Sequence, residues 1–120
     1  MSTFNRFEDI NAWQKARELV NQLYNTTNDG DFKNDFTLKN QINGAALSIM
    51  LNIAEGFGRK SNKEFANFLV ISHGSVSEVQ SALYAAMDRK HIDESQFNDF
   101  YSKCSEISKM IMGLTKYLRD

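Results

Sequence analysis

The chain has 120 residues, of which 42% are hydrophobic and 24% are charged, and 14 lysine and arginine residues nearly balance 15 aspartate and glutamate residues. This composition excludes a disordered chain and supplies enough apolar surface for one compact core, so we expect a single domain over residues 1–120. A formal net charge of −1 argues against an avid general nucleic-acid binder, because such proteins usually carry a clear basic surplus.

Three further features bound the class of protein. The chain contains no proline, so long uninterrupted helices are permitted throughout. Cys104 is the single cysteine, which rules out an intramolecular disulfide. The N-terminal stretch MSTFNRFEDINAW lacks the apolar segment of a secretory signal, and the longest apolar run is too short to span a membrane. We therefore expect a cytoplasmic protein that does not interact with membranes.

Apolar residues recur at helical spacing in four stretches, which predict helices over 8–27, 37–55, 62–89 and 94–118. Two of the predicted starts carry capping signals. Ser61 with Glu64 precedes the third helix, and Asp93 with Gln96 precedes the fourth. The core-facing residues of the fourth helix follow a seven-residue repeat: Phe97, Phe100, Cys104, Ile107, Ile111, Leu114 and Leu118.

The connections decide the topology. The second, third and fourth predicted helices are joined by only a few residues each, and loops that short make consecutive helices antiparallel neighbours. The link around 28–36 is longer and acidic. No strand-like alternation is present. The sequence therefore predicts an all-α, up-down-up-down antiparallel four-helix bundle.

The second predicted helix is apolar nearly all round, because only Ser48 and Asn52 are polar between Ala45 and Ala54. Either the other three helices surround it, or its outer face meets another copy of the chain. We favour the second explanation and expect a homo-oligomer. The candidate interface residues are Leu47, Met50, Leu51, Asn52, Ala54 and Glu55. An ionised Glu55 on such a surface needs a partner, and Arg59 is the nearest candidate.

Glycines mark further positions in the pattern. Gly56 and Gly58 predict the end of the second helix, since glycine readily takes the left-handed conformation at a helix C-terminus. Gly44 and the pair Gly74-Ser75 lie inside predicted helices, where glycine is unfavourable. We expect each of them to allow a close helix–helix approach.

A basic cluster begins the third predicted helix, where Arg59, Lys60 and Lys63 fall within five residues. Cations beside a helix N-terminus suit a phosphate group, so these residues are the candidate nucleic-acid contacts. Glu55 and Glu64 partly cancel their charge, and an ordinary solvated loop remains the alternative.

Signals for catalysis or metal binding are absent from the sequence. No glutamate is followed three residues later by a histidine, as di-iron helical bundles require. Cys104 with His73 or His91 could form a nucleophile and base, but Cys104 occupies a core position, where a small buried hydrophobic residue is expected. We predict no enzymatic activity and no cofactor.

Four stretches of the chain carry a family resemblance: residues 7–24, 38–69, 73–83 and 106–118, with NIAEGFGR at 52–59 as the most specific part. On these residues the chain resembles the four-helix bundle proteins of 23S rRNA intervening sequences, also called the S23 ribosomal protein family. It departs from the family at Asn43-Gly44, where a basic pair is common, and at Met50, where a proline is common.

The resemblance implies a homopentameric ring of four-helix bundles without an established biochemical activity. A related branch, the accessory proteins of diversity-generating retroelements, uses a basic surface of such a ring to bind nucleic acid and reverse transcriptase. The leading hypothesis is a non-enzymatic, homo-oligomeric scaffold. The alternative is a ring that binds RNA or DNA through Arg59, Lys60 and Lys63. Apart from other copies of the chain, the candidate partners are nucleic acid and a nucleic-acid-processing protein.

Overall fold

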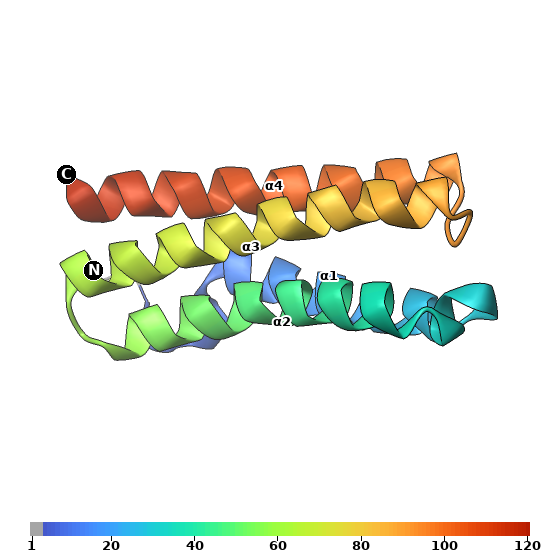
Figure 1. Ribbon diagram of the computed structural model, residues 1–120. Helices are drawn as coiled ribbons and strands as arrows, with labels where there is room; N and C mark the ends of the chain where they lie inside the picture. The colour runs from blue at the N-terminus through green and yellow to red at the C-terminus, as the bar shows by residue number, and fades with distance from the viewer. Residues whose placement is uncertain (1–3) are drawn as a thin grey trace.

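The computed structural model describes residues 4–120, in which all regular structure is helical. Four α-helices form a bundle with extents of 45 × 19 × 19 Å (Figure 1). They are α1 (Asn11–Thr27), α2 (Phe36–Gly58), α3 (Asn62–Asp88) and α4 (Glu94–Arg119), with the short 3₁₀ helices η1 (Phe7–Asp9) and η2 (Gly30–Asn34) flanking α1. The four predicted helices are thus confirmed, with ends that differ by at most three residues.

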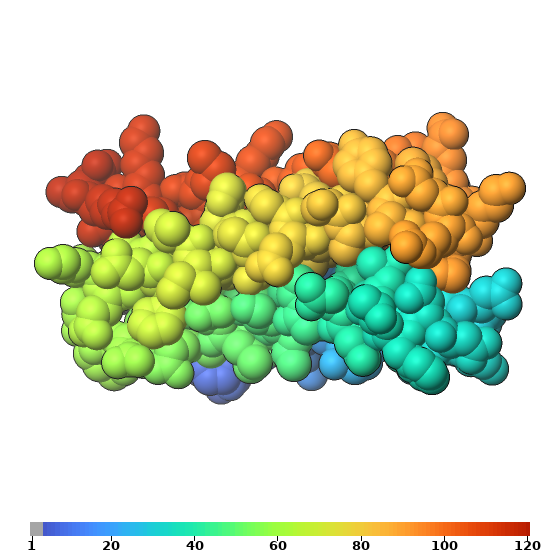
Figure 2. Space-filling view, in the orientation of Figure 1, coloured from blue at the N-terminus to red at the C-terminus, as the bar shows by residue number. Residues whose placement is uncertain are grey.

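Helix α3 lies between α2 and α4 on one face of the molecule (Figure 2). Ser75 of α3 bonds to Ser48 of α2, whereas Gly56 lies against Phe65 and Phe68. Residue numbers therefore rise along α2 as they fall along α3, and the two helices run in opposite directions.

Helices α3 and α4 also run in opposite directions, because Gln80 bonds to Ser105 whereas His73 bonds to Ser108. Helix α1 packs against α2 and α4 on the other side of the bundle. The α2–α3 turn and the end of α4 consequently lie at one end of the molecule, and the α1–α2 and α3–α4 connections at the other (Figure 1).

Side chains cap the starts of three helices. The Asp93–Gln96 box at α4 is complete, as predicted. At α3 only half of the predicted box forms: Ser61 accepts a hydrogen bond from the amide of Glu64, while the Glu64 carboxylate turns towards Arg59 instead. Asp35, which the sequence analysis did not identify as a cap, accepts from the amide of Leu38 at the start of α2.

One cluster of buried apolar side chains, drawn from all four helices, forms the core. The predicted inward positions of α4 are buried, apart from a partly buried Leu114. The core also holds Ser72, whose Oγ donates to the carbonyl of Ile49 at 2.7 Å. This bond satisfies the buried hydroxyl and fixes α3 against the backbone of α2.

The glycine predictions hold only in part, because α2 does end at Gly58 but no glycine there takes the left-handed conformation. Helix α2 continues through Gly56 to Gly58, and the left-handed residue after it is Lys60, with φ of 62°. Gly56 is buried, and a Cβ added to it would lie 2.7 Å from the Cβ of Phe68. The missing side chain therefore lets α3 pack closely against α2. At Gly44 and Gly74 an added Cβ would meet nothing within 4 Å, so neither glycine is needed for a close approach. Ser75, the other member of the predicted pair, does contact α2, through its bond to Ser48.

Within residues 4–120, none of the helices combines the length and apolarity needed to cross a membrane.

Candidate interaction surfaces

The six residues predicted to form an interface differ in how far they reach solvent. Leu51 is 55% exposed, and Glu55 is also exposed. Leu47, Met50 and Ala54 are partly buried and pack against the core of their own chain. Asn52 is engaged within α2, where its amide donates to the carbonyl and the hydroxyl of Ser48. The structure therefore leaves Leu51 as the outward apolar residue of this set.

Exposed apolar residues on α3 and α4 were missed by the sequence analysis, among them Val70, Ile71 and Met112. Val70 is 49%, Ile71 53% and Met112 57% exposed. The run FLVIS at 68–72 was the available signal, because a helical turn that is apolar in every direction must present some of its side chains to solvent. The core-facing pattern of α3 had drawn attention to Leu69 and Ser72 instead.

These residues form two neighbouring surfaces. Leu51 and Ile71 each lie one turn from the bonded pair Ser48–Ser75, on the seam between α2 and α3, and we call them the α2–α3 patch. On the other side of α3 lies a groove of about 340 Å³ between α3 and α4. We call this the α3–α4 groove, and it is lined by Val70, His73, Ile111, Met112, Thr115, Lys116 and Arg119.

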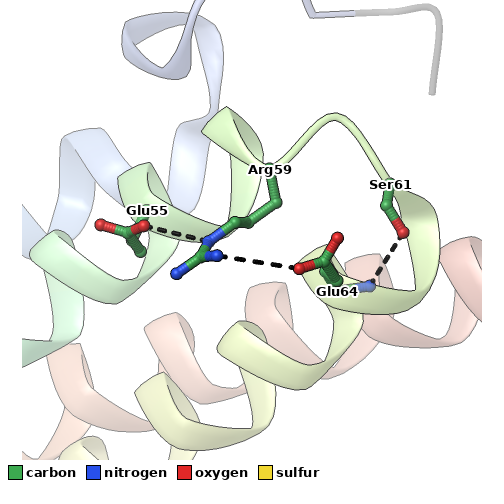
Figure 3. A network of polar contacts seen from close by, with 4 residues as sticks. All are labelled: Glu55, Arg59, Ser61 and Glu64. Carbon is green, nitrogen blue, oxygen red and sulfur yellow. Dashed lines mark hydrogen bonds and ion pairs between the residues drawn. The ribbon is translucent and has the colours of Figure 1, made fainter.

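Arg59, the first residue of the basic cluster, is held by two carboxylates at the α2–α3 turn (Figure 3). Arg59 Nε lies 3.1 Å from Glu55 Oε2, which confirms the predicted ion pair. Arg59 Nη1 lies 3.8 Å from Glu64 Oε1. The guanidinium also sits 5.0 Å from the centre of the Phe68 ring. Because two carboxylates share this one cation, Arg59 contributes little net positive charge to the surface.

The other two basic candidates are less constrained. Lys63 is exposed, and Lys60 places its ammonium 5.3 Å from the centre of the Phe57 ring. Neither lysine forms an ion pair within residues 4–120. The predicted basic patch is thus reduced to two lysines beside the start of α3.

The histidines and the cysteine occupy separate places. His73 Nε2 lies 2.8 Å from Ser108 Oγ, and His91 Nε2 lies 2.9 Å from Asp35 Oδ2. Cys104 is fully buried, and burial raises the pKa of its thiol to about 12, far above the range in which a thiolate nucleophile forms. In the part of the chain that the structure describes, no group of three or more histidine, cysteine, aspartate or glutamate side chains could hold a metal ion.

The pair formed by His91 and Asp35 joins the two connections at the far end of the bundle. The His91 ring stacks on Phe32 with 4.7 Å between ring centres, and Arg89 approaches Asp35 at 3.6 Å. The hydrogen bond from His91, the amide of Leu38 and the nearby positive charges hold the pKa of Asp35 below its usual range. This cluster links the α1–α2 connection to the α3–α4 connection.

These observations define an all-helical bundle whose distinguishing features are its outward apolar surfaces. The chain belongs to the 23S rRNA-intervening sequence protein family, which residues 8–113 match. A crystal structure from Bacteroides thetaiotaomicron, described as a protein of unknown function from the S23 ribosomal protein family, superposes with a TM-score of 0.81 at 23% identity. The match covers 88% of this chain and 95% of that one. No curated protein matches the chain.

The family resemblance predicted from the sequence is thus confirmed. The family is one of unknown function, and the structural similarity shows the fold alone. The relation to the accessory proteins of diversity-generating retroelements stays a prediction.

Proposed function

We propose that this chain is the subunit of a non-enzymatic, homo-oligomeric scaffold, an up-down-up-down bundle of one domain that assembles into a ring. The number of subunits that we propose, five, comes from the family resemblance. A cytoplasmic location belongs to the same proposal, and the candidate partners besides other copies of the chain are nucleic acid and a nucleic-acid-processing protein.

One observation carries it: the bundle has a complete core of its own, yet Leu51 and Ile71 remain more than half exposed on the α2–α3 seam. A side chain that the fold does not need is free to be buried against another molecule. Burial of the rest of a leucine or isoleucine contributes up to about 1.5 kcal/mol, so a few such residues repeated at each contact can hold subunits together. Exposed apolar patches commonly mark such contacts.

The test is the mass of the protein in solution, measured by size-exclusion chromatography with light scattering. We expect a wild-type mass near five subunits, and a shift to the monomer for Leu51→Asp. Tyr24→Asp on α1 is the matched control, because it places the same charge at an exposed apolar position away from the α2–α3 seam. Circular dichroism at 222 nm checks that each variant keeps its helices. A monomeric wild type would refute the proposal.

The alternative function is nucleic-acid binding by the ring. The observation that favours it is the position of Lys60 and Lys63 beside the start of α3, free of ion pairs within residues 4–120. The engagement of Arg59 by Glu55 and Glu64 weakens it. The ratio of absorbance at 260 and 280 nm, recorded on gently purified protein, separates the two proposals. If nucleic acid is present, the double variant Lys60→Ala/Lys63→Ala should lose it, and binding should weaken with salt.

A further inference from the structure

Residues of the α2–α3 turn and of the N-terminal segment line a cavity of about 200 Å³. Its walls include phenylalanines from three segments that are separate in the chain: Phe4 before η1, Phe57 in the last turn of α2, and Phe65 in the first turn of α3. The cavity is smaller than the sites of about 300–1,000 Å³ that hold drug-sized molecules. It therefore suits one flat ring rather than a large ligand.

The aromatic walls are held in place by the fold. Phe65 belongs to the core, and Phe57 meets it edge to face, with 6.1 Å between ring centres and 79° between ring planes. Phe4 and Phe57 pack against the core but are only partly buried. Preformed aromatic side chains of this kind are what unpaired nucleobases stack on.

The rim of the cavity is polar and basic. Lys60, Ser61 and Asn62 line it beside the aromatic walls, and the Lys60 ammonium lies 5.3 Å from the centre of the Phe57 ring. Asn62 is exposed, and its amide can both donate and accept hydrogen bonds, as the edge of a base requires. Aromatic walls with such a rim match a ligand that has apolar faces, polar edges and a negative charge close by.

The charge of the α2–α3 turn favours an anion only weakly. The turn holds three cations and two carboxylates, which leave one positive charge in excess: Arg59, Lys60, Lys63, Glu55 and Glu64. Both carboxylates contact Arg59 (Figure 3), so the two lysines are the cations that form no ion pair within residues 4–120. Because so small an excess attracts phosphates weakly, tight binding here needs a second contribution, and stacking in the cavity supplies one.

We infer, resting on the nucleic-acid binding proposed above as the alternative function, that this cavity takes one unpaired base of a single strand. The base stacks against the phenylalanine walls, the amide of Asn62 contacts its edge, and Lys60 and Lys63 hold an adjoining phosphate. A duplex keeps its bases stacked inside the double helix and can offer one only at the cost of unpairing it. The site therefore selects single strands over duplexes.

The experiment measures fluorescence anisotropy of labelled oligouridylate and oligodeoxythymidylate with the full chain, against a duplex and an abasic deoxyribose-phosphate strand of the same length. Phe57→Leu removes an aromatic wall and keeps an apolar side chain. Phe36→Leu is its matched control, because Phe36 is 67% exposed at the other end of α2. Lys33→Ala, at the exposed α1–α2 connection, is the control for Lys60→Ala/Lys63→Ala.

We expect both single strands to bind about 10-fold more tightly than the duplex and the abasic strand, which is the effect of one base–aromatic stack. Phe57→Leu should lower the affinity for single strands by a similar factor. Phe4→Leu changes a wall outside the four helices and serves as a second wall variant, and circular dichroism at 222 nm checks that each variant is folded. The double lysine variant should weaken binding and reduce its dependence on salt, whereas both controls should bind as the wild type does.

Two results would overturn the inference. Equal affinity for single strands, duplex and abasic strand, or affinity that both wall variants leave unchanged, would show that no base enters the cavity, although the chain still binds nucleic acid. Failure of the wild type to bind any of these strands would overturn the alternative function together with this inference.

Discussion

Replacement of Gly56 by alanine tests how closely α2 and α3 pack. Alanine is favoured over glycine inside a helix by about 1 kcal/mol, so helix propensity alone predicts a gain in stability. The new Cβ, however, would lie 2.7 Å from the Cβ of Phe68 and 3.0 Å from Cδ1 of Phe65. The nearest atom is bonded directly to the backbone of α3, so the helices themselves must move apart. Overpacking of this kind costs about 1–3 kcal/mol, and here we take the upper end.

The net expectation for Gly56→Ala is a loss of about 1–2 kcal/mol in the free energy of unfolding, or a fall in Tm of about 4–8 °C. Gly44→Ala is the matched control on the same helix, because a Cβ there meets nothing within the chain and should raise stability by up to about 1 kcal/mol. Urea unfolding followed at 222 nm, at one protein concentration and with the mass checked, measures both variants. A Gly56→Ala variant as stable as the wild type would refute the argument for close packing.

Two other groups give independent predictions. Because the folded pKa of Asp35 is lowered, the stability it contributes is present at neutral pH and is lost as the pH falls below about 4, through its folded pKa. Asp35→Asn should therefore lower Tm at pH 7 and flatten the acid limb of Tm against pH; an unchanged acid limb would count against the His91 contact. Cys104, buried with a pKa of about 12, should react with a disulfide reagent at pH 8 roughly 1,000-fold more slowly in native protein than in urea. Equal rates would mean that the core opens readily.

The helices could be predicted because the apolar spacing and the caps point to the same ends. At α4 the Asp93–Gln96 box and the seven-residue repeat agree, and the structure follows both. At the end of α2 the prediction for Gly56 was wrong, because it assumed that the glycine is present for its backbone flexibility. A sequence does not reveal whether a glycine is present for its dihedral angles or for its missing side chain. That distinction depends on how near Phe68 comes.

The outward apolar residues were predicted only in part for a related reason. A helix that is apolar all round shows that some residues must face outward, but which ones do so depends on the neighbouring helices. Met50 and Ala54 turn out to pack against their own core, whereas Ile71 and Met112 project from helices whose inward stripe had seemed sufficient. The sequence also placed Arg59 with Glu55 correctly but gave no sign that Glu64 would compete for it.

The complete core of the single chain has a consequence for the order of events during biosynthesis. Helices joined by short connections fold rapidly from local contacts, so the bundle can form from a single chain. In the assembly that we propose, the outward side chains of α2, α3 and α4 would be displayed for as long as the free subunit persists, and the rate at which they are covered would depend on its concentration. Substitutions at these outward positions can therefore change which chains associate while leaving the bundle itself unaltered.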